Sequence, residues 1–147
     1  MLVSSTYRQS ANSPYEVEAR TSDPDNRLLW HFRHRRLSAE ELRDSLLAIS
    51  GRLNRQLSGP SVMPPVKREL TELLYDPEQW QVTPDRSQHD RRSIYLIAKR
   101  NLRLPFLEVF DQPDLQISCS RRESSTHAPQ ALELLNGDLA GELAAAL

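Results

Sequence analysis

The strongest alternation of apolar and polar positions lies between residues 38 and 57. Ser38 precedes Glu41 by three residues, the spacing of a capping box, in which each side chain accepts a backbone N–H of the first helical turn. Charged side chains such as Arg43 lie largely off the apolar face. That face recurs every three or four residues, as in an amphipathic helix, at Leu42, Leu46, Ile49 and Leu53. We therefore predict a helix over 38–57, ended by the tripeptide Ser-Gly-Pro that follows.

Weaker patterns predict the other elements. We expect helices over 24–30, 66–74, 105–110, either 126–136 or 128–136, and 139–147, because proline, aspartate or a small polar residue precedes most of them. The β-branched and aromatic run 94–97 is the best strand candidate. Segments 10–22, 61–65 and 112–123, and the polar stretch around Trp80, are predicted to be loops. The fold class is therefore mostly α, with long irregular loops and at most a short strand pair.

Both ends of the sequence carry helical patterns that stop abruptly. Leu2, Val3 and Tyr7 fit one face of a helix end with nothing before it. Asp138 is expected to cap a final helix that reaches Leu147 without a C-cap. The prediction is a single partial domain over 1–147, truncated at both ends.

The composition indicates which class of protein this is but says little about its function. The 147 residues are 38% hydrophobic and 27% charged, with a formal net charge of -1, as in soluble globular domains. A near-neutral chain has no general attraction to nucleic acid or anionic membrane. No apolar run approaches the roughly 20 residues of a spanning helix, and the first residues do not form a signal peptide. Cys119 is the one cysteine, and a buried thiol is expected.

No motif assigns a reaction or a cofactor. The sequence has no G-x-S-x-G elbow, glycine-rich phosphate loop, CxxC or HExxH, and without CxxCH it cannot attach c-type haem covalently. His31 and His34 have the spacing of paired metal ligands, but the arginines around them oppose a bound cation. We expect no metal site and no cofactor in this chain. Asp111 or Asp114 is a candidate acid or base, although either aspartate could simply cap a turn.

Basic residues give the most informative charge pattern. Between positions 86 and 103, six positive side chains face one negative, a local net of +5. Guanidinium groups suit carboxylate, phosphate or sulfate. The same groups could instead form internal ion pairs and a solvated face. The candidate ligand-binding residues are Arg91, Arg92, Tyr95, Lys99, Arg100, Arg121 and Arg122.

Several stretches, taken in order, resemble one family. They are YRQS at 7–10, RRLSAEELRD at 35–44 with SGRL at 50–53, GPSV at 59–62, RRSIY at 91–95, and the run SC, RR, ST and APQAL between 118 and 132. This set resembles the planctomycete-specific domain of unknown function fifteen fifty-three, found near the C-terminus of large proteins. Those proteins often carry a cytochrome-c-like module as well.

The resemblance implies an interior fragment of a longer, multidomain protein that is exported to the cell envelope. It implies no activity, substrate or catalytic residue. The missing flanking segments of the parent protein would then be natural partners of this chain.

Three functions follow as hypotheses. The first is a non-catalytic binding or scaffold module that uses its arginines to recognise an anionic polysaccharide or a partner domain. The second is part of a polysaccharide-processing enzyme. The third is an accessory domain that docks a cytochrome-c-like module, and nucleic acid is disfavoured because only Tyr95 lies near for stacking.

Overall fold

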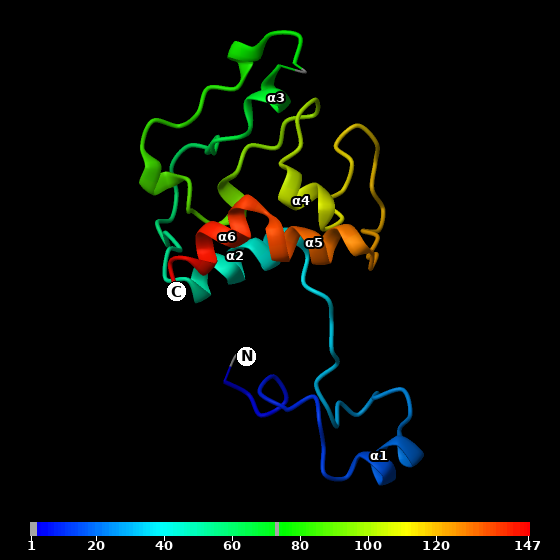
Figure 1. The fold of residues 1–147 in the computed structure, drawn as a ribbon. Coiled ribbons are helices and arrows are strands. Elements are labelled where there is room, and N and C mark those ends of the chain that lie inside the picture. The colour runs from blue at the N-terminus through cyan, green and yellow to red at the C-terminus, as the bar shows by residue number, and fades with distance from the viewer. Residues whose placement is uncertain (1–2, 73) are drawn as a thin grey trace. The chain divides into compact units, whose positions relative to one another are not determined.

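The structure, a computed structural model, describes residues 3–72 and 74–147. Helices make up about 36% of the chain, and the described residues form no sheet, which confirms the mostly α fold class. The chain divides into two compact units, here called unit 1 (Met1–Arg36) and unit 2 (Leu37–Leu147). Both can be followed by colour in Figure 1. Within the described ranges, no helix combines the length and the apolar character that crossing a bilayer requires.

Unit 1 contains α1 (Glu16–Ser22), so the predicted loop over 10–22 is wrong for its second half. Two glutamates in the first turn favour this helix electrostatically, and Glu16 pairs with Arg20 one turn later at 2.7 Å. Residues 3–8 form turns. Residue 2 of the predicted helix end lies outside the described residues.

The helix predicted over 24–30 is wrong. The Asp23 carboxylate accepts the backbone N–H groups of Arg27 at 2.9 Å and Leu28 at 2.7 Å, which gives the backbone an alternative to helical hydrogen bonds. Asn26 and Leu29 have positive φ angles of 54° and 56°. Such backbone angles cannot continue a right-handed helix.

Unit 2 begins with α2 (Ala39–Ile49), and its predicted capping box is present. The Ser38 hydroxyl accepts the Glu41 N–H at 3.3 Å, and the Glu41 carboxylate accepts the Ser38 N–H at 2.9 Å. The predicted extension to residue 57 is wrong. Gly51 turns the chain with a φ of 73°, which a glycine adopts without steric cost.

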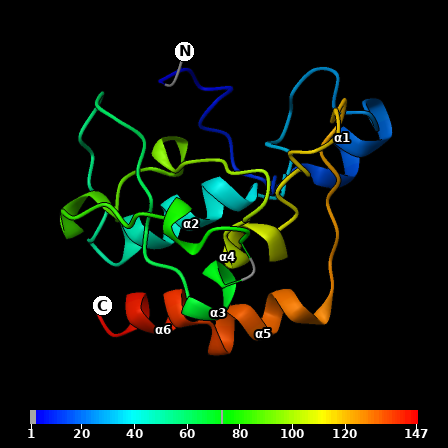
Figure 2. The same cartoon turned by 90° about the horizontal axis from the view of Figure 1, so that it is seen from above.

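The rest of unit 2 alternates short helices with long loops. α4 (Pro105–Val109), α5 (Ala128–Asn136) and α6 (Asp138–Ala144) confirm three predicted helices, but α6 is capped at Ala145, so its predicted run to Leu147 is wrong. Figures 1 and 2 show α5 and α6 as successive helices in one row alongside α2. Gly137 caps α6 without a side chain, and the Asp138 carboxylate instead binds Lys67 at 2.7 Å, so the predicted Asp138 cap is wrong.

Between α2 and α4 the chain is mostly irregular. α3 (Arg68–Thr71) is shorter than the helix predicted over 66–74, whose residue 73 lies outside the described residues. Three 3-10 helices follow: η1 (Pro77–Gln79), η2 (Arg86–Gln88) and η3 (Ser93–Tyr95). The strand predicted over 94–97 is wrong, because η3 occupies its start and only Leu96 pairs, in a single bridge to Val62.

Two apolar clusters hold unit 2 together. The first joins Ala39 of α2 to Phe106, Leu107 and Phe110. The second joins Leu74, Trp80 and Leu102. Trp80, expected in a polar loop, is only 6% exposed, and its indole N–H donates to the Pro64 carbonyl at 3.0 Å. Burying the ring while satisfying its one polar atom explains how a loop residue joins the core.

Candidate functional site

Helix α2 buries a charged residue. Ala39, Arg43 and Leu47 are four residues apart and form its buried stripe. The Arg43 guanidinium donates to the carbonyls of Arg91 at 2.9 Å and His89 at 2.7 Å, and to the Ser93 hydroxyl at 3.2 Å. Burial lowers the pKa of Arg43, and the nearby carboxylates of Asp44 and Asp90 act in the opposite direction. Arginine stays charged nonetheless, so a buried cation fastens α2 to segment 89–93.

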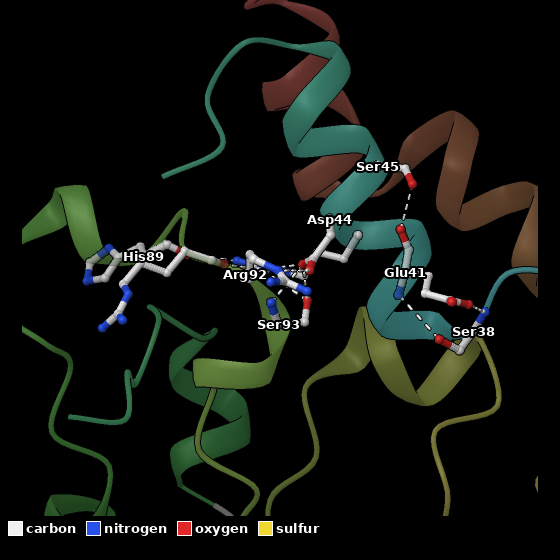
Figure 3. A network of polar contacts seen from close by, with 9 residues as sticks. Ser38, Glu41, Asp44, Ser45, His89, Arg92 and Ser93 are labelled. Carbon is white, nitrogen blue, oxygen red and sulfur yellow. Dashed lines mark hydrogen bonds and ion pairs between the residues drawn. The ribbon is translucent and has the colours of Figure 1, made fainter. Parts of the chain in front are cut away.

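The neighbouring Asp44 completes this contact from the other side. One carboxylate oxygen, Oδ1, accepts both the backbone N–H and the hydroxyl of Ser93 at 2.7 Å. The other oxygen lies 3.8 Å from Nε of Arg92. Figure 3 shows Asp44, Arg92 and Ser93 converging, with the capping pair Ser38 and Glu41 further along the same helix. The guanidinium of Arg92, a predicted ligand-binding residue, thus pairs with Asp44 through Nε, and the side chain is 52% exposed.

Arg91, the first predicted ligand-binding residue, lies inside unit 2. It is 1% exposed and lies over the ring of Tyr95, with its guanidinium carbon 3.7 Å from the ring centroid. It donates to the Gln56 and Pro60 carbonyls at 3.3 Å and also to the Ser58 carbonyl. The Arg91 guanidinium therefore cross-links loop 56–60 to the segment that follows η2.

Arg52 and Asp90 form a bidentate ion pair in the same region. Nε and one terminal nitrogen of Arg52 donate to the two Asp90 oxygens at 3.0 and 3.1 Å. Such paired contacts fix a guanidinium and a carboxylate in one plane. The single acidic side chain in the basic stretch 86–103 is thereby occupied by an arginine from outside it.

The remaining predicted cations lie apart from Arg91 and Arg92. Lys99 donates to the Gln79 carbonyl at 2.8 Å, and Arg100 is exposed. Arg121 is exposed, whereas Arg122 forms a bidentate pair with Glu40 in the first turn of α2, at 2.7 and 3.1 Å. The described contacts therefore divide the predicted residues between internal cross-links and separate exposed positions.

The ion pair between Glu40 and Arg122 shifts the pKa of both side chains. Partial burial by itself would raise the pKa of the Glu40 carboxyl, but hydrogen bonds from Arg122 and from its own backbone N–H hold it below the usual value. The hydrogen bonds that Arg122 donates to the Glu40 carboxylate raise the pKa of Arg122. Both side chains are partly exposed, so solvent weakens this attraction.

The candidate acids are engaged in local structure. Asp111 accepts the Ser125 N–H at 2.8 Å and the Ser125 hydroxyl at 2.6 Å, and has a positive φ of 64°. Asp114 accepts the Gln116 N–H at 2.9 Å, as a turn-capping aspartate does. Glu108, which precedes them, pairs with Arg103 at 2.8 Å.

Two further candidates are placed in different surroundings. Cys119 is exposed, with its thiol 3.2 Å from the Arg121 carbonyl, so the predicted buried thiol is wrong. His31 and His34 both line a cleft in unit 1. The described residues contain no group of three or more side chains arranged to ligate a metal ion.

Sequence analysis missed Arg43 and Asp44, which organise the region. The available signal was the four-residue spacing from Ala39 to Arg43 to Leu47, which places the arginine on the buried face. We had placed Arg43 off the buried face because charged side chains usually face water.

Comparison with known proteins shows which family this chain is related to. No curated protein and no solved structure matches the chain. The model of one family, described as PSD1, protein of unknown function (DUF1553), matches residues 1–147. The match covers the whole chain and agrees with the resemblance carried by the ordered set of short motifs. The chain therefore belongs to the PSD1 family of proteins of unknown function.

Proposed function

We propose that this chain is a non-catalytic binding module that recognises an anionic polysaccharide. The proposed contact is an arginine surface on unit 2, formed by Arg55, Arg86 and Arg92, all of which are exposed. Asn54 and Arg91 form a parallel β-bridge. The residues that follow them in the chain, Arg55 and Arg92, therefore both lie next to that bridge. The Asn54 amide donates to the Ser87 carbonyl at 2.8 Å, which brings Arg86 into the same neighbourhood.

One observation carries the proposal: the acidic side chains near this surface are already held by hydrogen bonds or ion pairs. Arg52 holds Asp90, and Ser93 holds one oxygen of Asp44, whose other oxygen lies 3.8 Å from Nε of Arg92. Hydrogen bonds from Ser87 lower the pKa of Asp85, which caps η2. The exposed guanidinium groups thus keep donors available for carboxylate or sulfate.

The buried cross-links support the surface from below. Arg91 and Arg43 fix loop 56–60 and segment 89–93 relative to α2. A backbone held in place before binding loses less conformational entropy when a ligand arrives. The fold therefore favours a preformed surface.

A catalytic role has less support in this chain. Both oxygens of Asp111 accept hydrogen bonds from Ser125, and the Asp114 carboxylate closes a turn. These contacts give both aspartates a structural role. In our proposal the chain serves as one module of a larger cell-envelope protein, in which other modules would perform any chemistry.

The test measures binding of the full chain to polygalacturonate and dextran sulfate, with neutral dextran as the reference polymer. We expect binding to the charged polymers that weakens as salt rises, because ions screen exposed charges over about 10 Å at 0.1 M. Arg92→Ala and Arg86→Ala should each weaken it by roughly two- to tenfold.

Arg68→Ala is the matched control, since Arg68 is 88% exposed on α3 and its side chain forms a local pair with Glu72. Equal loss of affinity in Arg68→Ala, equal binding to neutral dextran, or indifference to salt would each refute the arginine surface. Binding that is confined to a purified cytochrome-c-like domain would replace the polysaccharide with a protein partner.

A further inference from the structure

Unit 1 contains a cleft of about 440 Å³, which the predictions from sequence did not include. Cationic and aromatic side chains line much of it, namely Arg20, Trp30, His31, Arg33 and His34. The cleft is built within one compact unit, so its lining does not depend on the position of unit 2.

A set of hydrogen bonds from the segment Asp23–Asn26 shapes the cleft. Asn26, which is 3% exposed, donates to the His31 carbonyl at 2.8 Å and accepts the His31 N–H at 3.4 Å. The Trp30 indole N–H donates to the Asp23 carbonyl at 3.0 Å. The two aromatic residues are thereby held by their neighbours, with Trp30 and His31 ring centroids 4.0 Å apart.

The arginines of the cleft retain hydrogen-bonding capacity. Arg20 uses Nε and one terminal nitrogen on a single oxygen of Glu16, and Arg33 uses one terminal nitrogen on the Asp25 carbonyl. A guanidinium has five N–H donors, so both arginines have donors left. These contacts orient the two guanidinium groups and leave some of their N–H donors for a ligand.

One ring nitrogen of the cleft-lining His31 is buried without a partner in the described part of the chain. Nδ1 of His31 is buried and has no hydrogen-bond partner among the described residues. Buried polar atoms are uncommonly left unpaired in folded proteins, because the lost hydrogen bonds to water are not replaced. The atom is closed to solvent, so a ligand in the cleft contacts other atoms of His31 and of its neighbours.

From these features we propose that the cleft binds a small acidic sugar, one pyranose unit carrying a carboxylate or a sulfate. The oxyanion meets the guanidinium groups of Arg20 and Arg33, and a sugar face lies against Trp30. Asp25, which also lines the cleft, disfavours a ligand that is anionic all over but accepts hydrogen bonds from hydroxyl groups. Pro24 and Trp30 supply apolar surface in a lining that is otherwise polar, which suits a ligand rich in hydroxyl groups.

This inference concerns a site separate from the arginine surface and stands without it. The experiment titrates the full chain calorimetrically with glucuronate, glucose 6-sulfate, neutral glucose and inorganic sulfate. We expect at least one of the two acidic sugars to bind about tenfold more tightly than glucose and than inorganic sulfate. The first two ligands decide between carboxylate and sulfate.

Variants locate the binding. Arg20→Ala and His34→Ala should each reduce affinity for the acidic sugar several-fold, whereas Arg8→Ala, an exposed arginine of the same unit outside the lining, should not. Arg86→Ala and Arg92→Ala, on the arginine surface, should leave this affinity unchanged. The proposal is overturned if no acidic sugar binds, if inorganic sulfate binds as well as the sugars, or if Arg8→Ala weakens binding as much as Arg20→Ala.

Discussion

The guanidinium carbon of Arg91 lies 3.7 Å from the centroid of the Tyr95 ring. The Tyr95 hydroxyl in turn accepts the backbone N–H of Ser58 at 3.0 Å, and Arg91 donates to the carbonyl of the same residue. The tyrosine and the arginine thus bind one loop together. Gly59 lies at the tip of that loop with a φ of 99°, and a Cβ there would lie 3.5 Å from the Arg91 guanidinium. Two residues first considered for ligand binding therefore act inside the fold.

Replacing Arg91 should destabilise unit 2 without changing its surface. Arg91→Lys keeps the charge but loses the planar fork, and we expect a loss of about 1–3 kcal/mol in the free energy of unfolding. Arg91→Ala should cost more. Urea unfolding measures both, with Arg92→Ala as the control, which should stay within about 0.5 kcal/mol because that side chain is 52% exposed.

Arg43 should be equally important for the attachment of α2. Arg43→Met preserves much of the side-chain length but leaves the carbonyls of His89 and Arg91 without this donor. We expect a loss of about 2–4 kcal/mol, seen as a lower midpoint in thermal unfolding. An unchanged midpoint would show that the buried cation contributes no net stability, as occurs when its desolvation cost matches its contacts.

The capping box predicts a smaller and local effect. Ser38→Ala removes the acceptor for the Glu41 N–H and should cost about 1 kcal/mol. Ser38→Asp retains an N-cap acceptor and should recover most of that loss. Hydrogen exchange of the amides in the first turn of α2 distinguishes local fraying from global unfolding, and equal protection in both variants would contradict the assignment.

Asp23 predicts acid sensitivity in unit 1. Hydrogen bonds from the backbone N–H groups of Leu28 and Arg27 lower the pKa of Asp23 below its ordinary value of 3.8. A depressed pKa in the folded state means that the stabilisation is present above the unfolded-state pKa and is lost as pH falls through the folded-state pKa. We expect the amide resonances of Leu28 and Arg27 to shift below pH 3.8, and Asp23→Asn to remove most of that shift.

Local sequence signals determined several elements of this protein. Ser38 with Glu41 marked the start of α2, Pro105 marked the start of α4, and Asn136-Gly137 marked the end of α5. Each signal acts through hydrogen bonds or backbone angles within one turn, so nearby residues suffice to specify it. The family was also recognisable from short motifs taken in order.

Only the tertiary structure decided which side chains are buried and what they bind. Arg91 and Arg92 are adjacent and chemically identical, yet one is 1% exposed as a residue and the other 52% exposed at its side chain. Loop 56–60, which lies more than 30 positions earlier in the chain, supplies the acceptors that allow Arg91 to be buried. Periodicity describes one element at a time and carries no information about such distant partners. Burial of a charge depends on those partners, because an unpaired cation inside a protein is strongly unfavourable.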